Sequence, residues 1–147
     1  MLEIKVKTFQ ELTTDELYAI LQLRSEVFVV EQDCVYQDID DKDQKAVHVI
    51  GCKEDKVVAY TRLFKAGDYF DFASIGRVVV VEKERKHKYG YLIMERSIKV
   101  IEEQFKETKI HISAQKYLLN FYNSLGFKQV GEDYLEDGIP HIGMERG

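Results

Sequence analysis

The stretch Ile75–Phe105, IGRVVVVEKERKHKYGYLIMERSIKVIEEQF, decides the fold of this 147-residue chain. Its apolar run Val78–Val81 is typical of a buried strand, because β-branched side chains pack well in sheets. After a basic turn, apolar residues recur at spacings of three and four, which places them on one face of a helix. These residues are Tyr91, Met94, Ile98, Ile101 and Phe105. The stretch therefore predicts a strand, a turn and a helix in succession.

The turn carries four side chains that are cationic or can become so: Arg85, Lys86, His87 and Lys88. The first N–H groups of a helix have no acceptor within the helix, and the helix dipole is positive at this end. A helix N-terminus of this kind binds anions, so a phosphate-bearing ligand is its natural occupant. A solvated, charged helix start is the alternative, and the turn alone leaves it open.

This turn resembles the acyl-CoA signature of the GNAT acetyltransferases, Arg/Gln-x-x-Gly-x-Gly/Ala, in which backbone N–H groups bind the pyrophosphate of coenzyme A. Lys88 stands where the family has its first glycine, so this position lacks glycine's freedom at positive φ. The resemblance implies acetyl-CoA as the cosubstrate and a binding segment along the strand, the turn and the helix start. Its residues are Val78, Val79, Val80, Arg85, Lys86, His87, Lys88, Tyr89, Gly90 and Tyr91.

A second element, Leu119–Phe127, is similar to the family's Phe-Tyr-x-x-x-Gly-Phe. The family's tyrosine lies beside the thioester sulfur and protonates the departing thiolate, and Tyr122 occupies its position. Seven residues earlier, Gln115 stands where the family usually has an asparagine near the pantetheine. For Tyr122, a half-buried aromatic side chain with its hydroxyl in water is the alternative.

The N-terminal half, from Leu23–Gln32 (LRSEVFVVEQ) through the acidic Asp38–Asp43 segment to His48, resembles the ElaA-like branch of the GNAT superfamily. With it, the resemblance spans nearly the whole chain. It implies direct transfer to a primary amine of a small-molecule or amino-acid-like acceptor, in a ternary complex. A noncatalytic acyl-CoA-binding or regulatory module on the same fold is the main alternative, and an anion sensor or nucleotide-binding protein is the third class.

An amine is protonated at neutral pH, so direct transfer needs a base or a water relay. His141 matches a Pro-His-Ile-x-Met element that supplies the base in some GNAT members, Glu31 would act through water, and His48 is the third candidate. A structural hydrogen bond from strand to loop is the alternative for each. By resemblance, the N–H of Val78 meets the thioester carbonyl, and Val80 pairs with the pantetheine amides.

Arg24 and Arg77 precede or lie within apolar segments, which favours a place in the cleft or in an ion pair. If they face the cleft, they bind the acceptor together with His48, and the acceptor then carries a carboxylate that fits the arginine fork. Pairing with Glu31 or with the acids of Asp38–Asp43 is the structural alternative.

Local patterns complete the expected order of elements. A strand is expected over residues 2–7, a helix from a Thr13–Glu16 capping box, and a later helix ended by Gly126. Further strands are expected at Ala46–Cys52, Val57–Phe64, Phe72–Val81, Lys109–Ala114, Phe127–Gly131 and His141–Glu145, with the later helix at Lys116–Ser124. The chain is thus expected to form one α/β (α+β) domain over residues 1–147, with a mixed central sheet of six to seven strands flanked by helices. By the resemblance, the sheet is splayed between strands 4 and 5.

Composition and charge limit the classes of molecule that this chain is expected to bind. The net charge of −5 argues against a general affinity for nucleic acid or anionic membrane. The chain begins without a signal-peptide pattern and has no apolar stretch of membrane-spanning length, so a cytoplasmic location is expected. A homodimer is left open.

No metal site is expected. Cys34 and Cys52 lie far apart in the sequence and show no ligand spacing, and a nucleophilic role for Cys34 is not favoured. The acidic segment does not match a calcium loop, since Lys42 occupies a ligand position and Val49 stands where a bidentate glutamate is required.

Overall fold

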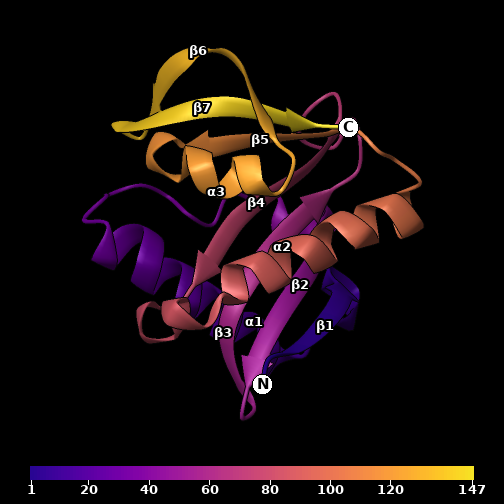
Figure 1. The fold of residues 1–147 in the computed structure, drawn as a ribbon. Coiled ribbons are helices and arrows are strands. Elements are labelled where there is room, and N and C mark those ends of the chain that lie inside the picture. Colours follow the sequence, from indigo (N-terminus) through magenta and orange to yellow (C-terminus); the bar gives the residue numbers. More distant parts are fainter.

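The structure is a computed structural model that describes residues 1–147. Seven strands form one sheet in the order β1-β2-β3-β4-β5-β7-β6, with helices on both faces (Figure 1). The strands are β1 (Glu3–Thr8), β2 (Val47–Lys53), β3 (Lys56–Phe64), β4 (Ala73–Val80), β5 (Ile110–Gln115), β6 (Lys128–Glu136) and β7 (Ile139–Arg146). The helices are α1 (Thr14–Arg24), α2 (Tyr89–Val100) and α3 (Leu119–Ser124), and α1 and α2 continue into the π-helical segments Ser25–Glu31 and Ile101–Phe105. The expected mixed sheet flanked by helices is confirmed.

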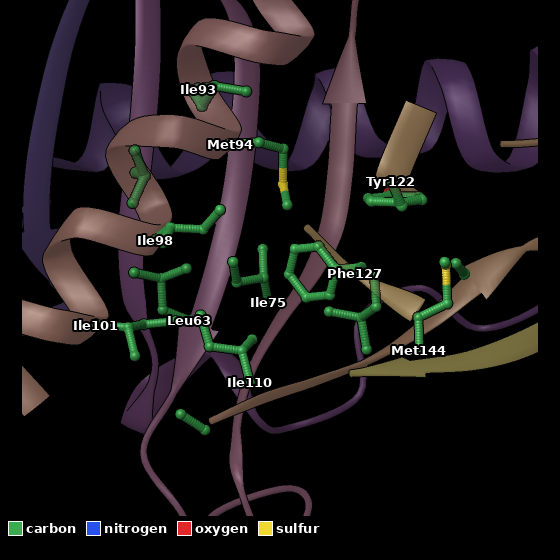
Figure 2. Close-up of a cluster of buried hydrophobic side chains, with 14 of the residues drawn as sticks. Leu63, Ile75, Ile93, Met94, Ile98, Ile101, Ile110, Tyr122, Phe127 and Met144 are labelled. Atoms are coloured by element: carbon green, nitrogen blue, oxygen red, sulfur yellow. The ribbon is translucent and has the colours of Figure 1, made fainter. Parts of the chain in front are cut away.

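Two apolar cores lie on the two faces of the sheet. Ile20 and Leu23 of α1 pack with Ile50 of β2, among others. Ile93 of α2 packs with Val49 of β2, in the larger cluster that Figure 2 shows around Ile75, Phe127 and Met144. Because successive residues of a strand point to opposite faces, Val49 and Ile50 contribute to different cores. The central strands are therefore covered on both sides.

The sheet opens between β4 and β5. These strands form the one parallel pair, and their register covers only Ala73 with Ile110 and Ser74 with His111. Beyond Ser74, β4 continues to Val80 without β5 beside it. The splay expected between the fourth and fifth strands is therefore confirmed, and it leaves backbone groups of β4 facing a gap.

A β-bulge lies in β4 next to this gap. Gly76 pairs with Arg62 and Val79 with Tyr60, so that Arg77 and Val78 together face a single residue of β3. Arg77 has a φ of 47°, in the left-handed region that non-glycine residues rarely adopt. A bulge takes backbone groups out of the regular ladder and redirects them. The polypeptide is thus bent at the point where an oxyanion-binding N–H was expected.

Local sequence signals placed the first half of the chain well. The N–H of Glu16 donates to Thr13 Oγ1 at 3.1 Å, and the N–H of Thr13 donates to Glu16 Oε1 at 2.8 Å, so the predicted capping box is present. The β2–β3 hairpin turns at Glu54 and Asp55, both with positive φ.

No helix is both long and apolar enough to cross a membrane.

The last hairpin differs from the prediction. The expected strands Phe127–Gly131 and His141–Glu145 are in fact longer, and they meet at a two-residue turn, Asp137-Gly138, with φ values of 52° and 77°. Both values are positive, as the type I′ hairpin turn requires. Gly131 lies at an irregularity within β6 rather than at its end. As a result, the polar segment after Gly131 forms part of the sheet and reaches the cleft.

Candidate active site

A cleft of about 540 Å³ lies at the opening between β4 and β5. Its walls come from the π-helical segment after α1, from β4, from the basic turn, from α3 and from the β6–β7 hairpin. It brings together most of the residues that the sequence nominated. They are Glu31, Arg77, Val78, Val79, Val80, Arg85, Lys88, Gly90, Tyr91, Gln115, Tyr122 and His141.

The basic turn leads into α2 through a left-handed residue. Residues Glu82–His87 form a 3-10 helix, and Lys88 follows with φ 60° and ψ 26°. Lys88 thus adopts the conformation for which glycine is usually selected, at a cost of about 1 kcal/mol or more. Directly after it, the N–H groups of Tyr89 and Gly90 begin α2 and have no acceptor within the helix. The helix start that the sequence predicted after the basic turn is therefore present without the glycine.

The cationic side chains of this turn do not all line the cleft. Arg85 lines the cleft and forms an ion pair with Glu31, with 2.7 Å between Nη1 and Oε2, and its Nε donates to the carbonyl of Val80 at 3.0 Å. The hydrogen bond with Glu31 raises the pKa of Arg85. Lys86 and His87 are exposed outside the cleft. The side chain of Tyr89 is buried outside it, so none of these three side chains lines the cleft.

Tyr91 differs from the helical pattern that was expected for it. It was assigned to the buried face of the long helix, but 36% of its surface is exposed. Its ring lies edge-to-face with Phe121 at 5.0 Å between centroids, and both residues line the cleft. Gly90 and Tyr91 in the first turn of α2 therefore line the cleft, whereas Tyr89, Ile93 and Met94 are buried outside it.

Tyr122 lies on α3 with 5% of its surface exposed, so the half-buried alternative is wrong. Its ring packs edge-to-face against Phe121 and Phe127, at 5.0 and 6.1 Å between centroids. Burial raises the pKa of the phenol, and no hydrogen bond within the protein contributes to this change. The hydroxyl therefore keeps its proton at neutral pH, as a proton donor requires.

His141 lies in the cleft and is 7% exposed. Its Nδ1 is 2.7 Å from the carbonyl of Ile139, which only an N–H can satisfy, so Nδ1 carries a proton. In the neutral ring, Nε2 is then free to accept a proton. Of the other base candidates, Glu31 lines the cleft but is held by Arg85.

His48 is completely buried outside the cleft, so its assignment to the acceptor site or as base is wrong. Its Nε2 lies 2.9 Å from the carbonyl of Asp43 and its Nδ1 lies 2.5 Å from the hydroxyl of Tyr60. Burial lowers the pKa of this imidazole. The structural hydrogen bond from strand to loop accounts for His48.

Arg24 is also completely buried outside the cleft, and its assignment to the acceptor is wrong. Its Nε is 2.8 Å from Asp38 Oδ2 and its Nη1 is 2.8 Å from Asp43 Oδ1. Burial opposes the charge of Arg24, but the contacts with these carboxylates outweigh it, so the pKa of the guanidinium is raised.

Arg77 does line the cleft, but its charge is already compensated. Its Nε lies 2.8 Å from Asp38 Oδ1, at an angle outside hydrogen-bond geometry, and its Nη2 donates to the carbonyl of Asp38 at 2.9 Å. Arg62 completes the network by a two-oxygen contact with Asp40, both distances 2.8 Å. The acidic segment thus pairs with Arg24 and Arg77, as the structural alternative proposed, and also with Arg62.

Several residues of the cleft were not nominated from the sequence. Glu136 reaches it because the β6–β7 hairpin is longer than expected, and Gln32 reaches it by a 3.2 Å contact with Gln115. The Asp-Gly pair at 137–138 is a strong hairpin signal and would have placed Glu136 beside the turn. The other missed residues include Phe28, Tyr36, Ser113 and Tyr117.

Comparisons with known proteins identify the family of this chain. The model of the acetyltransferase (GNAT) domain family matches residues 9–146. Protein ElaA of Escherichia coli K12 is 45% identical over 148 residues, covering 99% of this chain and 97% of ElaA. A UPF0039 protein of Schizosaccharomyces pombe is 41% identical over 145 residues, covering 97% of this chain and 95% of its own length.

Solved structures give the same result. The crystal structure of Escherichia coli ElaA has a TM-score of 0.93 at 44% identity and covers 100% of both chains. An acyl-CoA N-acyltransferase from Pseudomonas aeruginosa has a TM-score of 0.92 at 41% identity and covers 99% of both chains. In fold and in sequence over nearly its full length, this chain therefore belongs to the GNAT acetyltransferases, a family of acyl-CoA-dependent N-acyltransferases, and within it to the ElaA-like branch.

Proposed function

We propose that this protein transfers the acetyl group of acetyl-CoA to a primary amine of a small molecule, directly and within a ternary complex. The observation that carries the proposal is the hydroxyl of the buried residue Tyr122, which has no protein partner and lies in a cleft lined also by Lys88 and His141. A protonated phenol, an anion-binding turn and a free imidazole nitrogen are the groups that the reaction needs.

The residues of the cleft fit acetyl-CoA. The helix start after Lys88 would hold the pyrophosphate, and the unpaired part of β4 up to Val80 would hold the pantetheine as a neighbouring strand does. Arg85 would have to leave Glu31 to reach a phosphate. When bound, acetyl-CoA supplies a thioester, which makes the acetyl group reactive toward an amine.

The protein groups then divide the proton transfers. His141 Nε2 takes the proton that the ammonium must lose before its nitrogen can attack. The N–H of Val78, beside the bulge in β4, stabilises the negative charge that develops on the carbonyl oxygen. Tyr122 donates its proton to the sulfur that leaves.

The alternative is a noncatalytic module that binds acyl-CoA on the same fold. Such a module would need the turn but not Tyr122. The variant Tyr122→Phe separates the two, because it removes the proton donor and keeps the ring. We expect the variant to bind acetyl-CoA with unchanged affinity by calorimetry and to release thiol at least tenfold more slowly in the presence of an accepted amine.

Tyr18→Phe is the matched control, since Tyr18 is 71% exposed on α1. A screen of primary amines for thiol release from acetyl-CoA identifies the acceptor to use. Absence of thiol release with every amine, despite tight binding of acetyl-CoA, would favour the module. Equal turnover of Tyr122→Phe and the unmodified chain would remove Tyr122 from the mechanism.

A further inference from the structure

One wall of the cleft carries carboxylates whose charge no arginine balances. Ser113 of β5, with Glu136, Asp137 and His141 of the β6–β7 hairpin, lines this wall. The two arginines of the cleft are already paired, Arg77 with acids of the Asp38–Asp43 segment and Arg85 with Glu31. Lys88 belongs to the basic turn. The wall of the hairpin is therefore negative.

With the imidazole of His141 in its neutral form, two hydrogen-bond acceptors face each other on this wall. Nε2 of His141 lies 3.6 Å from Oε2 of Glu136, too far for a hydrogen bond, and Nδ1–H is committed to the carbonyl of Ile139. The imidazole is held in place, with 8% of the side chain exposed and with the ring of Tyr134 stacked on it at 6.1 Å. Ser113 donates to the other oxygen of Glu136 at 3.2 Å.

The neutral imidazole nitrogen and the carboxylate each need a hydrogen-bond donor. An alkylammonium has three N–H groups and a positive charge, and it satisfies both acceptors at once. A carboxylate on the ligand would meet the charges of Glu136 and Asp137 and would find no free arginine. The charge of this wall thus discriminates between acceptors.

We propose that the acceptor is an aliphatic amine without a carboxylate, whose ammonium binds between Glu136 and His141. This inference rests on the proposed function and selects one class within it: it excludes the amino-acid-like acceptor. In this proposal, Glu136 determines which charge the acceptor molecule carries.

Three primary amines of similar length test the proposal, with rates compared per amino group: 1,4-diaminobutane, 4-aminobutanamide and 4-aminobutyrate. Their second group carries a positive, a zero and a negative charge. We expect kcat/KM for acetyl transfer to fall in this order, by roughly tenfold or more between the first and the last at low ionic strength. Added salt should compress the difference.

The variant Glu136→Gln should lower kcat/KM for 1,4-diaminobutane roughly tenfold and reduce the discrimination against 4-aminobutyrate, while the affinity for acetyl-CoA stays unchanged. Glu132→Gln is the matched control, because Glu132 is exposed on the same strand and does not line the cleft. It should leave the order and the rates unchanged.

Two results would overturn the inference: a rate with 4-aminobutyrate equal to or above that with 1,4-diaminobutane, or a ratio of these two rates that Glu136→Gln leaves unchanged. Either one requires thiol release with at least one probe, so it leaves the proposed function standing. Thiol release with none of these probes but with amino acids would also refute the inference. No release with any amine would instead refute the proposed function.

Discussion

Replacing Asp40 by asparagine removes a carboxylate that ties the acidic segment to the sheet. Both oxygens of Asp40 lie 2.8 Å from Arg62, whose side chain is 1% exposed. Burial alone would raise the pKa of Asp40, but the contacts with Arg62 overcome it and hold the pKa at about 2, against a usual 3.8. At about 1.4 kcal/mol for each pKa unit, this difference corresponds to about 2.5 kcal/mol of folding stability at neutral pH.

The sign of the pH dependence follows from this lowered pKa. The contribution of Asp40 is complete above the unfolded value of 3.8 and is lost as the pH falls through the folded value of about 2. Asp40→Asn should therefore be less stable than the unmodified chain by about 2.5 kcal/mol at pH 7, by about half as much at pH 3, and almost equally stable at pH 2. Urea unfolding followed by circular dichroism at each pH measures the difference.

A matched control lies next to it in the sequence. Asp41 is exposed, and its side chain accepts only from Gln44 and not from an arginine. Asp41→Asn should change stability by less than about 0.5 kcal/mol at every pH. The buried His48 also destabilises the fold as the pH falls below 6.5, but it does so in every variant and cancels in the comparison. A loss for Asp40→Asn that stays the same from pH 7 to pH 3 would refute the reasoning.

Two further predictions concern the cleft. Arg85→Ala together with Lys88→Ala should weaken acetyl-CoA binding by at least tenfold in calorimetry and leave the circular dichroism spectrum unchanged. The control variant Lys86→Ala, whose lysine lies outside the cleft, should bind acetyl-CoA normally. Equal affinity in the double variant and the unmodified chain would contradict the pyrophosphate assignment. His141→Ala should remove the acidic limb of the pH dependence of kcat/KM, because the group that must be deprotonated to act is gone; if the limb persists, another group or water is the base.

The sequence predicted those parts of the fold that depend on neighbours along the chain. The capping box at Thr13 and the valine run of β4 are local signals, and the structure has both where they were expected. The last hairpin was misjudged because Gly131 was read as a strand end, although a glycine with positive φ also fits a bulge within a strand. The Asp-Gly turn that follows was the better signal.

Parts of the site depend on contacts between distant segments, and these could not be read from the sequence. Arg24 and His48 carry side chains typical of active sites, yet both are buried by the folding of the acidic segment over the sheet. Their spacing in the sequence contains no information about this. In contrast, Tyr122 and the basic turn were found because each belongs to a motif that is contiguous in the chain.

Lys88 shows that this turn reaches the left-handed backbone conformation without a glycine. The chain reaches φ 60° with a lysine and still begins α2 at the same point as the family signature requires. A search that demands glycine there would pass over proteins built like this one. A better criterion for recognising distant relatives is a residue that can adopt the left-handed conformation, placed two positions before a small residue such as Gly90 and followed by an amphipathic helix.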